Sequence, residues 1–343
     1  MLVEELRAEI AANGGWIPFA RYMERVVQAY YGRSDRQFGR GGDFVTAPEL
    51  GSLFGRTLAR QIRELEGPIL EVGAGSGALA HTLLAHKLER EYFILETSAA
   101  LRRRQAERLG ANVTFLERLP EQFRGVIVAN EVVDALPVHA VRWTEKGILE
   151  RGVNLSLTWE ERPAHGALLE AARALDVPVP YESEIGLAGR AWMRSVAERL
   201  EQGVLLVIDY GFPRHEYYHP QRAMGTLMVH SRHRTRGDPF ERPGEQDITA
   251  HVDFSALANA AREAGIEVLG YANQAQFLVN CGITEVLAEA NVDNALQYAP
   301  IAAEAHLLLS PAEMGELFKV LAVGRDINAP LLGFSRGDRR HTL

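Results

Sequence analysis

The segment ILEVGAGSGALAHTLL, from Ile69 to Leu84, constrains the fold of this chain more than any other stretch. An apolar run that ends in Gly73, Gly75 and Gly77 is typical of a buried strand that turns sharply into a helix. Glycine lets the backbone approach a ligand closely, and the following helix offers free N–H groups in its first turn. The segment therefore predicts a strand, a turn and a helix, with a ligand site at the turn.

The same alternation of strand and helix continues along the chain. We expect further strands at YFILET, NVTFLERL, GVIVANEVVDALP, GVLLVIDYG, IEVLGY and LFKVLAVGR, with helices such as SAALRRRQAERL and FSALANAAREAG between them. This order predicts right-handed crossovers and a mostly parallel sheet covered on both faces, which is an α/β Rossmann-like fold. The length of 343 residues allows one large domain with insertions.

Several regions lie outside this regular alternation. Residues 1–60 are expected to form a helical N-terminal extension that ends in a glycine-rich segment, residues 61–330 the ligand-binding domain, and residues 331–343 a frayed tail. The alternation in VHAVRW and VNLSLTW predicts a small antiparallel β insertion within about residues 138–200. Residues 272–316 are expected to add a helical insertion near the C-terminus.

The chain carries a formal net charge of −8 at pH 7 and has an isoelectric point near 5.8. A general nucleic-acid binder needs surplus Lys and Arg to neutralise phosphates, so we expect no nucleic-acid partner. The acidity leaves room for cationic substrates. Cys281 is the only cysteine, which excludes a disulfide framework and a cysteine-based zinc site, and we assign no metal.

The N-terminus MLVEELRAEI has charged and apolar residues at helical spacing, unlike a secretory signal peptide. No apolar run reaches the roughly 18 residues that a membrane-spanning helix needs. A single thiol suits a reducing compartment, so we expect a cytoplasmic protein that is not exported and has no membrane partner. The oligomeric state stays open, with a homodimer as the candidate.

Glu96 ends the expected second strand, about two dozen residues after Gly73. In such folds a carboxylate at this place accepts hydrogen bonds from the ribose hydroxyls of a cofactor. The alternative is an acid at the start of the next helix, which the helix dipole favours by at most about 1 kcal/mol.

The spacing of the glycines distinguishes between the candidate cofactors. A nicotinamide dinucleotide usually requires G-x-G-x-x-G, whereas this chain has G-x-G-x-G after Glu71.

This shorter pattern, with an acid before its first glycine, resembles class I S-adenosylmethionine-dependent methyltransferases. Six ordered segments between about residues 14 and 324 are similar to the MidA-like methyltransferase family, relatives of the mitochondrial complex I assembly factor that methylates arginine. The segments are GGDFVTAPELGSLFG, LEVGAGSGALA, LETSAALRRRQ, ANEVVDALPV, IDYGFPRHEYYHPQRAMGTLM and GEQDITAHVDFSAL.

The resemblance implies a class I methyltransferase fold, S-adenosyl-L-methionine as the cofactor, and a protein arginine as one class of substrate. The cofactor site is then expected at Glu71, Gly73, Ala74, Gly75, Gly77, Glu96, Thr97 and Asn130. An NAD-dependent oxidoreductase remains the alternative enzyme. A methyltransferase-like assembly scaffold without turnover is the alternative outside catalysis.

The segment ANEVVDALP supports methyl-transfer chemistry independently. The ligand crevice of an open parallel sheet lies beyond the carboxyl ends of its strands, so Asn130, Glu131 and Asp134 should emerge beside the transferable methyl group. Two carboxylates there suit a guanidinium, because they fix its planar fork and localise electron density on the attacking nitrogen. Alternatively, Asp134 caps the following turn and Glu131 is merely solvated.

The segment GEQDITAHVDF should reach the same edge of the sheet, because it lies between the fifth strand and the next helix. His251 is a candidate for orienting the substrate or removing a proton near neutral pH. Its alternative role is a structural hydrogen bond. Asp253 is the second candidate in this segment, and its alternative role is the N-cap of FSALANAAREAG.

The glycine-rich segment GRGGDFVTAPELGSLFG precedes a helix start, because Thr46 and Glu49 have capping-box spacing and Pro48 lies in the first turn. Flexible glycines before a capped helix are typical of a lid over a ligand. We therefore expect Asp43, Phe44 and Thr46 to line or cover the cofactor, and the capping box does not exclude this role.

Overall fold

The computed structural model describes residues 1–33, 45–86, 88, 90–230, 237–291 and 293–343. Its main sheet has eight strands in the order β14-β15-β10-β5-β2-β3-β4, with β13 beside β10. The bounds are β2 (Ile69–Val72), β3 (Tyr92–Leu95), β4 (Thr114–Leu116), β5 (Phe123–Asn130), β10 (Leu200–Phe212), β13 (Val252–Asp253), β14 (Glu267–Asn273) and β15 (Phe318–Arg325). Only β15 pairs antiparallel with its neighbours among these strands. The expected mostly parallel α/β fold is confirmed.

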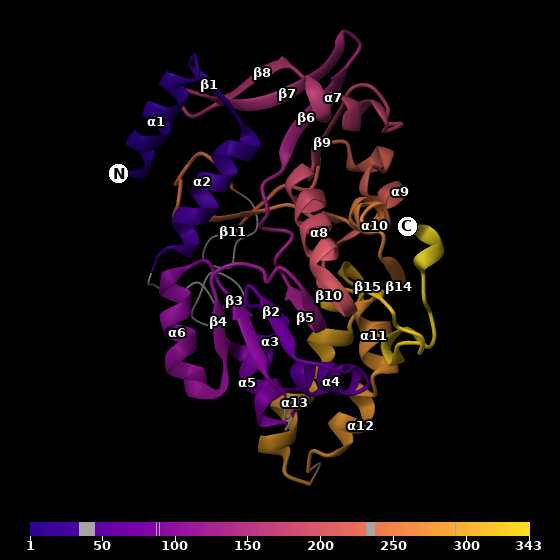
Figure 1. Cartoon of the computed structure of the whole chain (residues 1–343). Helices are drawn as coiled ribbons and strands as arrows, with labels where there is room; N and C mark the ends of the chain where they lie inside the picture. Colours follow the sequence, from indigo (N-terminus) through magenta and orange to yellow (C-terminus); the bar gives the residue numbers. More distant parts are fainter. Residues whose placement is uncertain (34–44, 87, 89, 231–236, 292) are drawn as a thin grey trace.

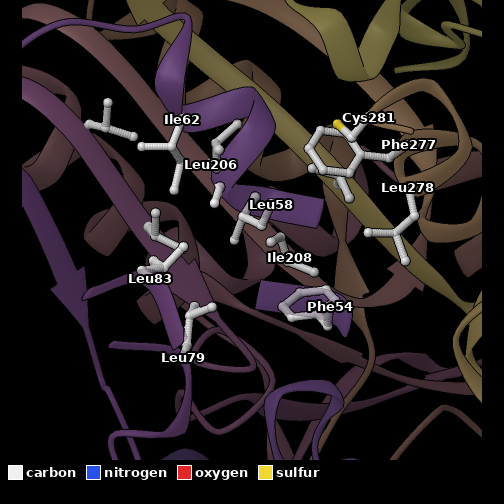
Figure 2. Close-up of a cluster of buried hydrophobic side chains, with 14 of the residues drawn as sticks. Phe54, Leu58, Ile62, Leu79, Leu83, Leu206, Ile208, Phe277, Leu278 and Cys281 are labelled. Atoms are coloured by element: carbon white, nitrogen blue, oxygen red, sulfur yellow. The ribbon is translucent and has the colours of Figure 1, made fainter. Parts of the chain in front are cut away.

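Side chains of β10 alternate between two apolar cores, as the pleat of a strand requires. Leu206 and Ile208 face the core that holds α4 (Leu53–Arg63), α5 (Ala78–Ala85), α11 (Gln274–Asn280), α12 (Ile283–Ala288) and α13 (Ala295–Leu309). Figure 2 shows them in one cluster with Phe54, Leu58 and Ile62 of α4 and with Leu79 and Leu83 of α5. Leu205 and Val207 face the opposite core, which holds α8 (Leu187–Arg199) and α10 (Phe254–Glu263).

A second, antiparallel sheet of five strands lies at one end of the molecule, and α12 and α13 lie at the other (Figure 1). Its strands are β1 (Trp16–Pro18), β6 (His139–Thr144), β7 (Gly147–Asn154), β8 (Trp159–Pro163) and β9 (Tyr181–Ile185). The expected strand VNLSLTW is wrong, because β7 ends at Asn154 and a turn follows. The Asn154 carboxamide oxygen accepts hydrogen bonds from the Ser156 and Thr158 N–H groups and so holds that turn.

The N-terminal extension is divided between the two sheets. Helices α1 (Leu2–Ala12) and α2 (Phe19–Tyr31) pack on the antiparallel sheet, and β1 pairs with β7. Helix α4, in contrast, packs on the main sheet. The extension is therefore not purely helical, because Trp16–Pro18 extends an edge of the antiparallel sheet.

The remaining elements are the helix α6, which lies between β3 and β4 in the chain, and short connections and edge pieces. They are α3 (Ala47–Leu50), α6 (Ala99–Leu109), α7 (Gly166–Arg173), α9 (Arg214–Tyr217), α14 (Met314–Leu317), β11 (Met228–His230), β12 (Asp247–Thr249) and 3₁₀ turns at Gly110–Asn112, Pro220–Arg222, Leu332–Phe334 and Arg340–Thr342. No helix in the described ranges is both long and apolar enough to cross a membrane.

The C-terminal tail is ordered, so the expectation that it frays is wrong. The Asp338 carboxylate accepts a hydrogen bond from Tyr271 N–H, and Arg339 N–H donates to the Tyr271 carbonyl at 2.6 Å. Phe334 packs edge-on against Phe277 with ring centroids 5.3 Å apart. These contacts fasten the tail to β14 and α11.

Candidate active site at the carboxyl edge of the main sheet

A cavity of about 930 Å³ lies where the strands β2, β3, β5 and β10 end. Its lining comes from the turns after these strands, from α2 and α3, and from β11 and β12. The volume falls within the roughly 300–1,000 Å³ that small-ligand sites usually have. The position matches the crevice in which open α/β sheets bind their ligands.

The glycine turn after β2 forms one side of this cavity. Gly73, Gly75 and Gly77 have φ angles of +65°, +54° and +78°, a region that side chains rarely adopt. A Cβ atom on Gly73 would stand 3.0 Å from a methyl group of Val132. Gly73, Ala74 and Gly75 line the cavity, whereas Gly77 lies at the N-cap of α5.

Glu71 and Glu96 present carboxylates beside this turn. The Glu71 carboxylate accepts a hydrogen bond from the Tyr92 hydroxyl at 2.6 Å, and burial raises the pKa of Glu71 to about 7. The Glu96 carboxylate accepts hydrogen bonds from Ser98 N–H at 2.9 Å and from the Gln105 amide at 3.0 Å. Ser98 is the N-cap of α6, so Glu96 lies two residues before this cap.

The end of β5 brings the expected acid pair to the same cavity. Asn130 donates a hydrogen bond to the Glu131 carboxylate at 3.2 Å, and Glu131 has a φ of +53°. Such a backbone conformation costs a residue with a side chain about 1–3 kcal/mol and marks a candidate functional position. The Glu131 N–H donates to the Ile208 carbonyl at 2.8 Å, which holds this conformation against β10.

The pKa values of the two carboxyl groups, Glu131 and Asp134, are both raised. Burial, followed by repulsion from Asp134, raises the pKa of Glu131 to about 8. Burial also raises the pKa of Asp134 to about 6, while the nearby Tyr210 hydroxyl lowers it in part. A cation bound in the cavity would lower both pKa values, because it attracts the ionised carboxylates.

The cavity lining contains more acidic than basic side chains. Among the described residues, the acids are Glu24, Glu49, Glu71, Glu96, Glu131, Asp134 and Asp247, and the basic side chains are Arg103 and His230. This excess of carboxylates favours cationic ligands.

The N-terminal helix α2 contributes a side of the cavity that the sequence did not predict. Its residues Glu24, Val27, Gln28 and Tyr31 line the space. The Tyr31 hydroxyl donates to the Asp247 carboxylate of β12 at 2.9 Å. The apolar spacing of α2 predicts an amphipathic helix, but it does not tell which part of the molecule the helix covers.

His251 and Asp253 lie outside this cavity, at a separate pocket of about 30 Å³. The His251 ring stacks on Phe212 with centroids 5.3 Å apart, and burial lowers its pKa to about 4. Its backbone N–H donates to the Thr226 hydroxyl at 3.2 Å. The Asp253 carboxylate accepts from Ala256 N–H at 3.0 Å and caps α10. His251 and Asp253 therefore make the structural contacts that the sequence analysis gave as their alternative roles.

The segment around Thr46 differs from a capping box. Thr46 lines the cavity and stands at the N-cap of α3, but within the described part of the chain its side chain makes no capping hydrogen bond. The Glu49 carboxylate instead accepts a hydrogen bond from the Ser76 hydroxyl of the glycine turn. Asp43 and Phe44 lie outside the described residues.

The cavity fits S-adenosyl-L-methionine in three respects. Its size suits a small ligand, its acids complement a positively charged sulfonium, and its glycine turn allows close backbone approach. In addition, two buried oxygens of the lining, Asn130 Oδ1 and Asp134 Oδ1, accept no hydrogen bond from any described residue. Buried polar atoms usually have partners, so these oxygens are suited to ligand N–H or O–H donors.

Comparison with known proteins identifies close relatives. A family model of S-adenosyl-L-methionine-dependent methyltransferases matches residues 53–272. A Burkholderia thailandensis protein crystallised with S-adenosyl-homocysteine is 47% identical, with a TM-score of 0.95 and coverage of 100% of this chain and 96% of that chain. A native structure from the same organism is 48% identical, with a TM-score of 0.91 over the same shares.

Curated relatives are more distant in sequence. The mitochondrial protein arginine methyltransferase NDUFAF7 homologue of Drosophila melanogaster is 28% identical over 97% of this chain and 88% of its own length. The mitochondrial NDUFAF7 of Danio rerio is 28% identical over 94% of this chain and 86% of its own length. The expected cytoplasmic location is wrong on this comparison, because these relatives are named as mitochondrial proteins.

Proposed function

The chain belongs to the family of S-adenosyl-L-methionine-dependent methyltransferases, and from this premise we propose that it methylates an arginine side chain of a protein. The observation that carries the proposal is the acid pair, Glu131 and Asp134, at the end of β5 in an acidic cavity. The names of the curated relatives support the same substrate. The NAD-dependent oxidoreductase has no support from the family assignment.

We assign the cofactor to the glycine-turn side of the cavity. Glu96 would accept hydrogen bonds from the ribose hydroxyls, and the backbone of Gly73, Ala74 and Gly75 would lie against the ligand. Bound S-adenosyl-L-methionine supplies an electrophilic methyl group on a positively charged sulfur. Glu71, whose carboxylate is nearby in the lining, would balance cationic charge on the ligand.

The acid pair would hold the guanidinium by charge-assisted hydrogen bonds and orient one nitrogen toward the methyl group. That nitrogen loses a proton as it gains the methyl group, and the carboxylates of Glu131 and Asp134 are the proposed acceptors. The raised pKa of Glu131, about 8, suits proton transfer near neutral pH. Binding of the cationic guanidinium lowers this pKa, so the carboxylate is ionised when the substrate is in place.

We further propose that different parts of the chain form the cofactor side and the acceptor side of the cavity. Residues 61–330 would supply the cofactor site and the acid pair, as the βα units predict. Helix α2, together with β11 and β12, would close the acceptor side of the cavity. The contact between Tyr31 of α2 and Asp247 of β12 supports this arrangement.

The substrate can be identified with isotope-labelled S-adenosyl-L-methionine. The purified protein is incubated with cell extract from a deletion strain, and labelled residues are located by mass spectrometry. We expect the label on arginine side chains of one or a few proteins. Label confined to RNA or small molecules would contradict the arginine proposal while leaving the family assignment in place.

A further inference from the structure

Asp209 ends the apolar run of β10 and is fully buried, at 0% exposure. Its carboxylate accepts hydrogen bonds from Val133 N–H at 3.0 Å and from Asp134 N–H at 3.2 Å. It also accepts a hydrogen bond from Tyr210 N–H at 2.9 Å. A charged residue in the centre of a sheet is costly, so these three bonds point to a role that an apolar residue could not fill.

The bonds from Asp209 fasten the loop that carries the acid pair. Val133 and Asp134 N–H are held by the carboxylate, and Glu131 N–H is held by the neighbouring Ile208 carbonyl of β10. Both ends of the segment 131–134 are therefore anchored on one strand. This anchorage explains how Glu131 keeps its unfavourable φ of +53° while its side chain lines the cavity.

Asp209 also forms a cluster of three carboxyl groups with Glu131 and Asp134. Burial, followed by repulsion from Asp134 and Glu131, raises the pKa of Asp209 well above its usual range. Within the described ranges, none of the three forms an ion pair with a Lys, Arg or His. Asp134 and Asp209 are buried and Glu131 is partly buried, so ionisation of one of these carboxyl groups opposes ionisation of the others.

The other polar groups around the cluster do not supply a counter-charge. Tyr210 of β10 and Tyr31 of α2 are neutral phenols whose pKa values burial raises well above the usual range. Lys319 of β15 is the register partner of Asp209, but its ammonium group donates to the carbonyls of Glu316 and Leu317. The nearby His251 is kept neutral by burial, which lowers its pKa to about 4.

We propose that Asp209 is a positioning residue for methyl transfer, which fixes the loop 131–134 and shares a proton with Glu131 and Asp134 until a cationic side chain enters the cavity. The inference rests on the proposed function in one respect, because the guanidinium is the cation. When it enters, the shared proton leaves to solvent, and the cluster presents the charge that the guanidinium pairs with. After transfer, the proton released by the methylated nitrogen returns to the cluster.

The Glu131→Gln variant tests the shared proton without any substrate. Aspartate carboxyls are labelled with ¹³C, the Asp209 signal is assigned by its loss in Asp209→Asn, and the cofactor-free protein is titrated by NMR. Removing the charge of Glu131, which raises the pKa of Asp209, should lower the titration midpoint of Asp209 by about one pH unit, which corresponds to a tenfold change in its ionisation constant. An unchanged midpoint in a folded variant would overturn the shared proton.

Glu304→Gln is the matched control. The Glu304 carboxylate is also buried and accepts hydrogen bonds from two consecutive N–H groups, those of Leu53 at 2.7 Å and Phe54 at 3.3 Å. It lies on α13, outside the residues that line the cavity. The Asp209 midpoint should not move in this control. A movement equal to that in Glu131→Gln would overturn the proposal, because it would show a general effect of losing a carboxylate.

Turnover then tests the positioning role. For an arginine acceptor, the kcat of Asp209→Asn should fall by about tenfold or more, because the loop that carries the acid pair loses its anchor, while S-adenosyl-L-methionine affinity stays within about twofold of wild type. An unchanged kcat would overturn the link to methyl transfer. If wild-type protein methylates no arginine, the proposed function fails, whereas the NMR titration still decides the proton shared by Asp209.

Discussion

Glu131 combines an unfavourable backbone angle, a partly buried side chain with a raised pKa and a place in the cavity lining. Its folded-state pKa of about 8 lies above the ordinary value of 4.5. Between these values the folded protein holds a proton that the unfolded chain has released. Raising the pH therefore removes stability, which is fully present below about pH 4.5 and is lost as the pH rises through about 8.

Because the stability of the wild type falls as the pH rises, the effect of Glu131→Gln on the melting temperature should depend on pH in the absence of cofactor. At pH 4 the wild-type carboxyl is mostly protonated in both the folded and the unfolded state and resembles the amide, so the two proteins should melt at similar temperatures. At pH 9 the ionised carboxylate opposes burial in the wild type, and the variant should melt higher by about 2 °C or more. A difference that is constant from pH 4 to pH 9 in differential scanning fluorimetry would contradict the raised pKa.

Glu96→Ala should weaken cofactor binding, because the ribose hydroxyls lose their acceptor. We expect a loss of about 1–3 kcal/mol, or roughly tenfold to a hundredfold in Kd, measured by calorimetric titration with S-adenosyl-homocysteine. Glu107→Ala removes an exposed acid from the same region, on α6, and serves as the control. Equal affinities in the two variants would remove Glu96 from the cofactor site.

The sequence predicted the candidate site residues that follow strands, but it missed candidate site residues that come from other elements. Glu96, Asn130 and Glu131 were found because the ends of parallel strands meet at one edge of a sheet. Asp209 lies within β10, near its carboxyl end, but the residue type alone does not show that its carboxylate faces the loop after β5. Tyr31 was missed because its contact with Asp247 spans most of the chain.

The glycine turn is the element on which cofactor binding depends most. In Gly73→Ala the new methyl group would meet Val132 at 3.0 Å, and the φ of +65° would be strained. Gly265→Ala provides the matched control, because Gly265 has a φ of +77° with open space around its Cβ position. Both variants should lose roughly 1 kcal/mol of stability, since alanine tolerates positive φ poorly.

Only Gly73→Ala should also lose cofactor affinity, by tenfold or more, because its side chain enters the lining of the cavity. Urea unfolding measures the stability of each variant, and calorimetry measures the binding of S-adenosyl-homocysteine. Full affinity in Gly73→Ala, with the stability loss present, would mean that the backbone of this turn does not approach the ligand.

Elements of the main sheet were predicted well because their apolar runs are buried on both faces. The antiparallel insertion was harder, since its strands carry charged residues that pair across the sheet. Arg151 of β7 forms ion pairs with Glu161 of β8 and Glu182 of β9, and these side chains mask the alternation of apolar residues. The strand β9 was therefore missed, and the end of β7 was misplaced.

The whole molecule joins segments that are far apart in the sequence around one cavity. Residues from α2, from the turns of the main sheet and from β12 line the same space. The Glu304 carboxylate of α13 caps α4, so the C-terminal insertion also supports the helix that follows α3. Such long-range contacts depend on packing of complete elements, and no local pattern in the sequence predicts them.

We propose that this arrangement separates cofactor binding, at Glu96 and the glycine turn, from acceptor chemistry at Glu131. The most direct measurement compares single-turnover methyl transfer by wild type and Glu131→Gln on the identified arginine acceptor, with cofactor Kd determined in parallel. We predict that the rate falls roughly 100-fold or more while cofactor affinity changes by less than about twofold, as expected when one electrostatic stabiliser is removed. A folded Glu131→Gln protein that transfers the methyl group at the wild-type rate would contradict the claim.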